Sequence, residues 1–383
     1  HSQSTDSFYF NIFTNIIIIF AIWLIRQYIQ NSVKICNKMP ETVMTVNGEI
    51  DLDSLGTTLM HEHIYANNSG WWHCPSCEDR MDLANSNVNM NILGELRMDP
   101  FVNKDNIVLN DLGAVTDELK ELYKLGGRTI VDPTNIGIGR DPKILKKISK
   151  KTKLNIVMGS GFYLQPTHPG YVKKMDKNNI SELIINEFDN GVDNSGIKIG
   201  LVGEIGISKD FTKEEEKVLR GAAIASRETK LPLSVHLPGW ERHGKKVLDI
   251  AKEEGCLNKQ IILCHMNPSH DDLDYQKNLA DNGAWIEYDM IGMDFYYADQ
   301  KAQCPYDNEN AEAIRILIEE GYIGSILFSQ DVFIKMMLKK YGGFGYTYIL
   351  THFKNRLINL GVSENQISEI LINNPKKVFS FDI

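Results

Sequence analysis

TTLMHEHI, residues 57–64, is a short β-branched and apolar stretch that ends in two histidines separated by one glutamate. Such a stretch predicts a buried strand. Residues i and i+2 of a strand point to the same side, so His61 and His63 face one way and can hold one metal ion, while Glu62 faces the other. An open, nucleotide-binding sheet would instead carry a glycine-rich turn after its first strand. The stretch therefore weighs against an open doubly wound sheet.

Strand-like and helical patterns alternate from this stretch to the C-terminus. We predict eight strands, at Thr57–Ile64, Thr129–Thr134, Asn155–Tyr163, Gly200–Ser208, Leu231–Leu237, Gln260–Met266, Ala284–Met290 and Ser325–Asp331. Amphipathic patterns between them predict helices, for example at Val115–Leu125, Pro142–Lys151, Thr212–Thr229, Gly244–Glu254 and Asn308–Gly321. This alternation predicts βαβ units, and eight units over about 320 residues fit a (β/α)8 TIM barrel. Trp71–Asn110 is expected to form a long loop with short helices over the barrel mouth.

Metal-ligand side chains lie at or near the carboxyl ends of five of the predicted strands. Besides His61 and His63, they are Glu204, His236, His265 and Asp331. Active sites of such barrels lie at the carboxyl ends of the strands, so we expect four histidines and two carboxylates to meet at one rim. Imidazole and carboxylate groups are ligands of zinc. We therefore predict a binuclear metal centre that holds two divalent ions, with zinc as the expected metal.

Other side chains near the predicted rim are weaker candidates. Tyr163 ends the third strand and Tyr288 lies near the end of the seventh, where each could bind substrate or serve as a barrel-wall aromatic. His168, in the loop after the third strand, could line the mouth as a third substrate-binding residue. Asp132 could orient a ligand histidine or have a capping role.

Composition narrows the class of protein. The chain has 383 residues, 43% of them hydrophobic, and a formal net charge of −9. The length suits one large domain or two small ones, and the negative charge argues against a nucleic-acid partner, which would require a basic face. The expected partner is a small-molecule substrate, although net charge favours no particular one. The six cysteines are too sparse for a disulfide scaffold, so we expect reduced thiols and a cytoplasmic protein. Whether the chain forms a homodimer stays open.

The N-terminus differs from the rest of the chain. Residues 7–25 carry no charge, and the length of this segment is close to the roughly 20 residues that span a bilayer. Basic residues follow this segment, so insertion would leave the barrel in the cytosol as a membrane-anchored domain. Alternatively, residues 1–38 are an extension foreign to the enzyme, because Met39 precedes the first strand closely. We therefore divide the chain into an apolar extension, 1–38, and a hydrolase barrel, 39–383.

Several motifs resemble those of a known family. TLMHEH at 58–63, GEIG at 203–206, the strand-end histidines and the Gln330-Asp331 pair look like the phosphotriesterase family of the amidohydrolase superfamily. The resemblance runs from about Val46 to Phe379. IKIGLVGEIG at 197–206, EYD at 287–289 and KYGGFGY at 340–346 resemble the phosphotriesterase-related protein subgroup.

The resemblance implies roles for the predicted ligands. His61, His63 and Asp331 would bind the more buried ion, His236 and His265 the more exposed one, and a carboxylate would bridge the two. Asp331 would also be catalytic, taking a proton from the attacking water and passing it to the leaving group.

Two departures from the family pattern bear on the substrate. Organophosphate-cleaving members bridge their metals with a carboxylated lysine, whereas this position is Glu204, and Met290 stands where lactonases carry arginine. Members of the related subgroup are associated with hydrolysis of N-acetyltaurine. We therefore expect an amidohydrolase for N-acyl amino sulfonates or N-acyl amino acids. An organophosphate triesterase or lactonase, and a catalytically inert ligand-binding barrel, are the alternatives.

An anionic substrate also needs a cationic group in its pocket. Three lysines in the loop after the eighth strand are candidates for it: Lys335, Lys339 and Lys340.

Overall fold

The computed structural model describes residues 42–75 and 80–380. Thr42–Phe379 form one compact unit. The predicted extension, with the candidate membrane segment at 7–25, lies outside the described residues. In the part of the chain that is described, no helix combines the length and the apolar character needed to cross a bilayer.

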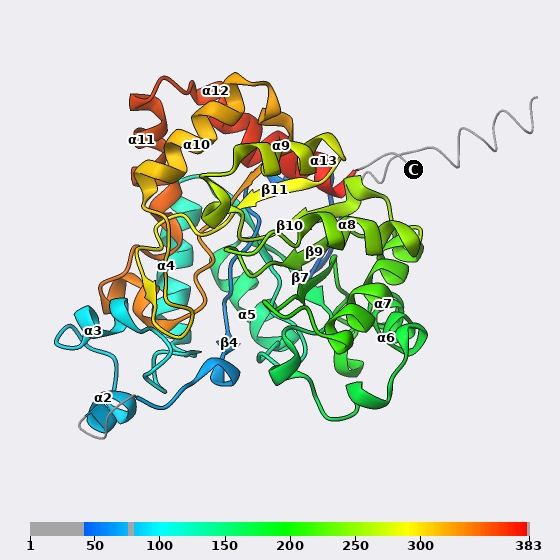
Figure 1. The fold of residues 1–383 in the computed structure, drawn as a ribbon, viewed down its shortest axis with the longest axis horizontal. Helices are drawn as coiled ribbons and strands as arrows, with labels where there is room; N and C mark the ends of the chain where they lie inside the picture. The colour runs from blue at the N-terminus through cyan, green and yellow to red at the C-terminus, as the bar shows by residue number, and fades with distance from the viewer. Residues whose placement is uncertain (1–41, 76–79, 381–383) are drawn as a thin grey trace, which may run out of the picture. The chain divides into compact units, whose positions relative to one another are not determined.

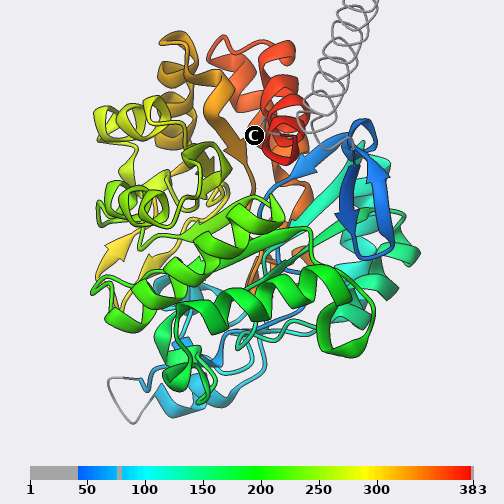
Figure 2. The same cartoon turned by 90° about the vertical axis from the view of Figure 1, so that its right-hand side faces the viewer.

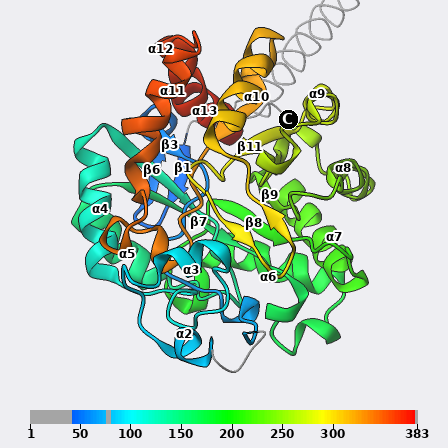
Figure 3. The same cartoon turned by 60° about the vertical axis from the view of Figure 1, so that its left-hand side comes forward.

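One eight-stranded parallel sheet forms the centre of this unit. Its strands, in order, are β3 (Thr57–Leu59), β6 (Gly127–Asp132), β7 (Asn155–Ser160), β8 (Leu201–Gly206), β9 (Leu233–His236), β10 (Ile261–Leu263), β11 (Trp285–Tyr288) and β14 (Ile326–Phe328). Backbone hydrogen bonds from Met60 N–H to Phe328 O (3.2 Å) and from Asp331 N–H to His61 O (3.1 Å) join the first strand region to the last. These bonds close the sheet, and the predicted (β/α)8 barrel is confirmed (Figure 3).

Helices between the strands, and three more after the last strand, cover the outside of the barrel (Figure 1). They are α4 (Leu112–Lys124), α5 (Pro142–Thr152), α6 (Lys177–Asn190), α7 (Lys213–Thr229), α8 (Gly244–Glu253), α9 (Leu273–Asp281), α10 (Asp307–Glu319), α11 (Lys354–Asn359), α12 (Glu364–Ser368) and α13 (Asn374–Phe379). Local chemistry fixes where they begin. The Thr212 hydroxyl accepts a hydrogen bond from Glu215 N–H, and the Glu215 carboxylate accepts one from Thr212 N–H, a capping box that starts α7.

In its described part, the segment predicted to lie over the barrel mouth, Trp71–Asn110, contains short elements: α2 (Met81–Asn85), α3 (Leu93–Met98) and β5 (Val108–Leu109). The chain enters it through β4 (Ala66–Asn67), which pairs with β5, and the 3-10 turn Ser69–Trp71. Figure 1 shows α2 and α3 together, apart from the barrel helices. Polar contacts tie this segment to the loop after β14: Lys335 Nζ lies 2.5 Å from Asp105 Oδ1, and Asn106 Oδ1 accepts from Met336 N–H at 2.9 Å.

A hairpin precedes the barrel and packs against it. It consists of β1 (Thr42–Thr45) and β2 (Gly48–Asp51), drawn dark blue in Figure 2. Val46 N–H donates to Ile156 O at 2.9 Å, which attaches the hairpin to β7. Val43 packs in one apolar cluster with barrel residues such as Val157 and with Phe379 at the end of α13.

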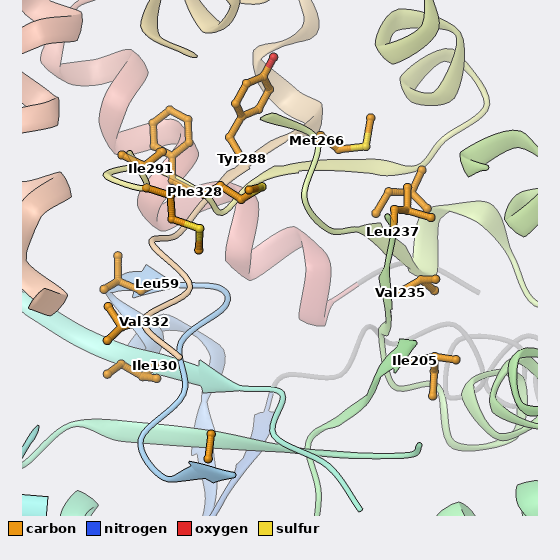
Figure 4. Packing of buried hydrophobic residues seen from close by; sticks show 14 of the residues in the cluster. Leu59, Ile130, Ile205, Val235, Leu237, Met266, Tyr288, Ile291, Phe328 and Val332 are labelled. Atoms are coloured by element: carbon orange, nitrogen blue, oxygen red, sulfur yellow. The ribbon is translucent and has the colours of Figure 1, made fainter. Parts of the chain in front are cut away.

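A second apolar cluster fills the space between the strands and the surrounding helices. Leu59, Ile130 and Ile205 contribute to it from β3, β6 and β8, as Figure 4 shows. Leu119 of α4 belongs to the same cluster. Apolar side chains thus cover the outer face of the strands, while polar side chains gather where the strands end.

Candidate metal centre

The six predicted ligand side chains lie together at the carboxyl ends of the barrel strands. Glu204 lies within β8, and His236 is the last residue of β9. The other four follow the ends of β3, β10 and β14 by two to four residues: His61, His63, His265 and Asp331. Five of the six are buried and His236 is partly exposed. The structure therefore brings the predicted set together at the rim where barrel enzymes carry their chemistry.

The Glu204 carboxylate lies between two pairs of histidines. Its Oε1 is 3.6 Å from His61 Nε2 and 3.5 Å from His63 Nε2. Its Oε2 is 3.3 Å from His236 Nδ1 and 3.7 Å from His265 Nε2. Each carboxylate oxygen thus faces one histidine pair, which is the arrangement that a bridging ligand between two ions needs.

Asp331 completes one of these groups. Its Oδ1 is 3.3 Å from His63 Nε2 and 3.7 Å from His61 Nε2, so it faces the same histidine pair as Glu204 Oε1. Its other oxygen lies 4.0 Å from His265 Nδ1. Asp331 therefore stands between the two histidine pairs and is 7% exposed.

The distances between these atoms fit ligands that share an ion. Most are longer than the roughly 2.7–3.2 Å of a good hydrogen bond. Two ligands at about 2.0–2.2 Å from one tetrahedral ion lie roughly 3.3–3.6 Å apart, close to the distances observed. Among the described residues, His61 Nε2, Glu204 Oε2 and Asp331 Oδ1 are buried polar atoms without a hydrogen-bond partner. Leaving such atoms unpaired costs about 1–3 kcal/mol each, so the donor set suits divalent ions.

One pair in the cluster is closer than the rest. His265 Nε2 and His236 Nδ1 lie 2.7 Å apart, within hydrogen-bond distance. Burial and the neighbouring charge of His265 lower the pKa of His236. Burial also disfavours the charged form of His265, but Asp289 outweighs burial and raises its pKa to about 10. One histidine of the pair thus acts as donor and the other as acceptor.

Glu204 stays ionised in this environment. Burial opposes its charged form, but the charge of His61 and the nearby rings of His236 and His265 outweigh burial and hold the pKa of the carboxyl well below its usual range. A buried carboxylate that remains charged needs cations around it, which again suits a metal centre.

The outer nitrogens of the histidines have partners of their own. His63 Nδ1 lies 2.7 Å from Thr134 Oγ1. Asp132, for which the sequence left open a role in orienting a ligand histidine or in capping, binds backbone groups: its carboxylate accepts from Thr134 N–H at 3.0 Å and from Ile64 N–H at 3.1 Å. Such contacts fix the orientation of a ligand imidazole.

Asp289 and Glu287 are positioning residues that the sequence did not identify as such. Asp289 Oδ1 is 3.0 Å from His265 Nδ1, and its Oδ2 is 3.3 Å from His61 Nδ1. Glu287 Oε2 is 3.4 Å from the same His61 nitrogen. Both carboxylates are fully buried. Their i, i+2 spacing, which places both on one side of a strand, was the available signal.

Glu62 points away from the cluster, as predicted, and supports it from behind. Its carboxylate accepts hydrogen bonds from the Ser329 hydroxyl and from the backbone of Gln330 and Val332, at 2.8–2.9 Å. These bonds hold the turn that carries Asp331, whose φ of 49° lies in the left-handed region. Non-glycine residues avoid that region unless their surroundings enforce it, so the turn is built to present this side chain.

A cavity of about 580 Å³ opens onto the cluster. His63, Glu204, His236, His265 and Asp331 line it, so a small molecule in the cavity can reach the candidate metal centre. A cavity of this size suits a drug-sized ligand.

The three predicted substrate-binding residues have different positions. Tyr163 lines the cavity, with its hydroxyl 3.2 Å from His236 Nδ1. His168 does not line it, because Glu214 and the Tyr163 carbonyl engage both of its ring nitrogens at 2.8 and 2.7 Å. Tyr288 is fully buried and donates to Gln276 Oε1 of α9 at 2.7 Å. Figure 4 shows Tyr288 among the apolar residues outside the barrel, so only Tyr163 keeps access to substrate.

The three candidate lysines do not reach the cavity. Each pairs with an acid elsewhere at 2.5–2.8 Å: Lys335 with Asp105, Lys339 with Glu121 and Lys340 with Asp111. Within the described residues, the cations that line the cavity are instead Lys209 and Lys301. They lie in loops after β8 and β12, where no strand or helix periodicity predicts side-chain direction.

Comparisons with known proteins agree with this geometry. The model of the phosphotriesterase family matches residues 41–379. A protein of Xenopus tropicalis named N-acetyltaurine hydrolase is 34% identical over 343 residues, which cover 88% of this chain and 98% of that protein. A Nematostella vectensis protein named phosphotriesterase-related protein is also 34% identical, with the same coverage. The solved structure of a resiniferatoxin-binding protein from Rhodobacter sphaeroides is 49% identical, with a TM-score of 0.89, covering 90% of this chain and 96% of that one.

Proposed function

The chain belongs to the phosphotriesterase family, a family of hydrolases, and we propose that it hydrolyses N-acyl amino sulfonates or N-acyl amino acids, such as N-acetyltaurine. The observation that carries this proposal is Glu204, a carboxylate between two histidine pairs at the position where organophosphate-cleaving members have a modified lysine. Relatives named N-acetyltaurine hydrolase, similar along 88% of this chain, support it.

The metal centre of this proposal holds two divalent ions, with zinc as the expected metal. His61, His63 and Asp331 would bind the first ion, and His236 and His265 the second, with Glu204 shared. The accessibility of the histidines supports this division: the side chains of His61 and His63 are 1% and 4% exposed, whereas those of His236 and His265 are 12% and 8% exposed. Ions bound there would act as Lewis acids that polarise the scissile carbonyl and lower the pKa of water.

Asp331 is the proposed proton carrier. Its carboxylate lines the cavity and lies beside both histidine pairs, within reach of a water that attacks a carbonyl carbon. It would take a proton from this water as the new C–O bond forms and pass it to the leaving nitrogen as the C–N bond breaks. The products are a carboxylic acid and an amine, so the proton balance closes.

Tyr163 is the proposed substrate-orienting residue. Burial, with the charges of Glu204 and Asp331, raises the pKa of this phenol well above its usual range, so its O–H remains a hydrogen-bond donor. A donor that lines the cavity beside His236 can hold the carbonyl oxygen of the substrate.

A second candidate function is ligand binding without turnover. The observation that favours it is the 49% identical structure from Rhodobacter sphaeroides, which is named for binding resiniferatoxin. Six candidate ligands and three unpartnered ligand atoms favour a working metal centre, because retaining such a centre serves no purpose in simple binding.

A substrate panel tests the proposal. Zinc-loaded protein is assayed against N-acyl taurines, N-acyl amino acids, lactones and phosphotriesters. We expect the highest kcat/KM for an N-acyl substrate. Preference for a phosphotriester or a lactone would replace the proposed reaction, and absence of turnover on the whole panel would favour the binding protein.

A further inference from the structure

Aromatic side chains form much of the cavity surface. We name this set of six cavity-lining residues the aromatic wall: Trp71, Phe101, Tyr163, Trp240, Tyr297 and Phe333. No member belongs to a strand of the barrel sheet, so the wall is built by the loops above the metal centre.

Three rings of the aromatic wall form a continuous stack. The ring centroids of Trp71 and Phe101 are 5.1 Å apart at an interplanar angle of 17°. Those of Phe101 and Tyr297 are 5.3 Å apart at 7°. Trp240 meets Tyr297 edge-on, at 5.8 Å and 82°. These are the preferred geometries of aromatic pairs, so the surface is ordered before a ligand arrives.

The aromatic wall is held rigidly and reaches the metal centre. Phe101 and Tyr297 are 3% and 6% exposed. The indole N–H of Trp72 donates to Val102 O at 3.0 Å. Trp72 follows Trp71 and Val102 follows Phe101, so this bond holds the two stacked residues side by side. Tyr163 lies 6.4 Å from the ring of Trp71, and its hydroxyl is 3.2 Å from His236. A substrate that reacts at the centre therefore extends along the wall.

The charged side chains that line the cavity contribute less to ligand binding than the aromatic wall does. Lys209 and Lys301 line it, but so do Glu241 and Asp299, so the formal charges of these four side chains cancel. Lys209 also lies 3.4 Å from Glu241 and is mostly exposed, where ion pairs contribute little. Binding selectivity in this cavity therefore rests on its aromatic surface.

We infer that the substrate carries an aromatic ring on its acyl group, as in an N-phenylacetyl amino acid or amino sulfonate. This inference rests on the hydrolysis proposed above and names its substrate class. An acetyl group fills only a small part of a 580 Å³ cavity and leaves the partly exposed members of the wall, Trp71, Trp240 and Phe333, in contact with water. A ring joined to the carbonyl by one methylene reaches from the reacting carbon to the aromatic wall and covers it.

The test compares acyl groups on one amine. N-acetyl-, N-hexanoyl- and N-phenylacetyltaurine, and the same three derivatives of glycine, are hydrolysed by the zinc-loaded full chain. Burying a ring the size of a phenylalanine side chain predicts roughly a ten- to hundredfold higher kcat/KM for phenylacetyl than for acetyl. An acetyl compound that equals the phenylacetyl one would overturn the inference and leave the proposed hydrolysis intact. A higher value for hexanoyl would overturn the aromatic assignment, and no turnover of any N-acyl compound would overturn both.

Matched variants connect the preference to the aromatic wall. Phe101→Leu removes one stacked ring from the cavity, and Phe344→Leu removes one that stacks on Tyr348 at 4.2 Å outside it. The ratio of phenylacetyl to acetyl kcat/KM should fall by about two- to tenfold in the first variant and stay unchanged in the second. An equal ratio in both variants would contradict the role of the wall.

A binding readout does not depend on turnover or on variants. Trp71 and Trp240 belong to the wall, so phenylacetate added to the zinc-loaded protein should change tryptophan fluorescence in a saturable way, whereas acetate should not. Identical responses to the two anions would contradict the inference.

Discussion

Replacing Asp289 by asparagine should disturb two candidate ligand histidines at once. Its carboxylate oxygens lie 3.0 Å from His265 Nδ1 and 3.3 Å from His61 Nδ1, and both accept from the backbone N–H of His265 at 3.0 Å. Asparagine retains the size of the side chain but has only one oxygen. The NH2 group of the asparagine must therefore face one of the histidine nitrogens that donate to the carboxylate in the unmodified protein.

The size of the effect follows from these contacts. A buried donor that faces another donor is left without a partner, which costs about 1–3 kcal/mol. Loss of a carboxylate that orients a ligand histidine typically weakens metal binding by about 10–100-fold, or roughly 1.4–2.7 kcal/mol. The two ranges overlap. We therefore expect Asp289→Asn to bind at least one zinc ion about 10–100-fold more weakly than the unmodified protein.

Competition with a chelator measures this change. Metal-free protein is titrated with zinc in the presence of a chromophoric chelator, and circular dichroism establishes that the variant is folded. Asp274→Asn is the control, because this acid is exposed on α9 and pairs with Lys277, away from the cavity. A folded Asp289→Asn protein whose zinc affinity equals that of the control would refute the positioning role.

Three further predictions concern other parts of the chain. Asp331→Asn should lower kcat by about 10²–10⁴-fold with little change in KM, and near-normal kcat at full metal content would exclude it as proton carrier. Burial raises the pKa of Glu118 from 4.5 to about 7, so its contribution to stability is present below the unfolded pKa and lost as pH rises through the folded one. Glu118→Gln should therefore raise Tm relative to the unmodified protein at about pH 8 but not at about pH 4. The gain in the free energy of unfolding at pH 8 should be up to about 3 kcal/mol. Equal differences in Tm at both pH values would contradict this assignment. A chain of residues 39–383 should be soluble and retain metal-dependent turnover, because the described barrel unit begins at Thr42, and an insoluble product would assign the N-terminal segment to the fold.

The barrel and the ligand cluster could be predicted because both follow from local patterns. The extended chain continues past β3: Glu62 N–H donates to Val131 O on one side, and His63 N–H to Val332 O on the other. The two-residue alternation therefore holds at His61 and His63, although the regular strand ends at Leu59. The predicted strands are longer than the observed ones for this reason, since their last residues leave the sheet to build the site.

The support of the ligands was harder to identify from sequence. Glu287 and Asp289 face the barrel interior, and by the same alternation Tyr288 must face outward, where it meets Gln276. Nearness to the rim alone does not give the direction of this tyrosine side chain. The neighbours on either side were the better guide, because two carboxylates on one strand face require a polar environment.

The aromatic wall could not be predicted. Trp71 and Phe101 belong to the segment over the mouth, and Tyr297 to a two-residue strand nearly 200 positions later. Loops have no periodicity that gives side-chain direction, and their contacts depend on how the whole barrel closes. The same reason explains why the cavity lysines, Lys209 and Lys301, were not among the expected ones.

Metal content of two variants tests the central claim most directly. Glu204 lies between the two histidine pairs, whereas Lys198, the last lysine before β8, lies outside the set that lines the cavity. The account predicts two zinc ions per chain in the unmodified protein and in Lys198→Ala, both with N-acyl hydrolysis, and loss of at least one ion together with turnover in Glu204→Gln. Full zinc content and turnover in Glu204→Gln, or loss of metal in Lys198→Ala alone, would contradict it.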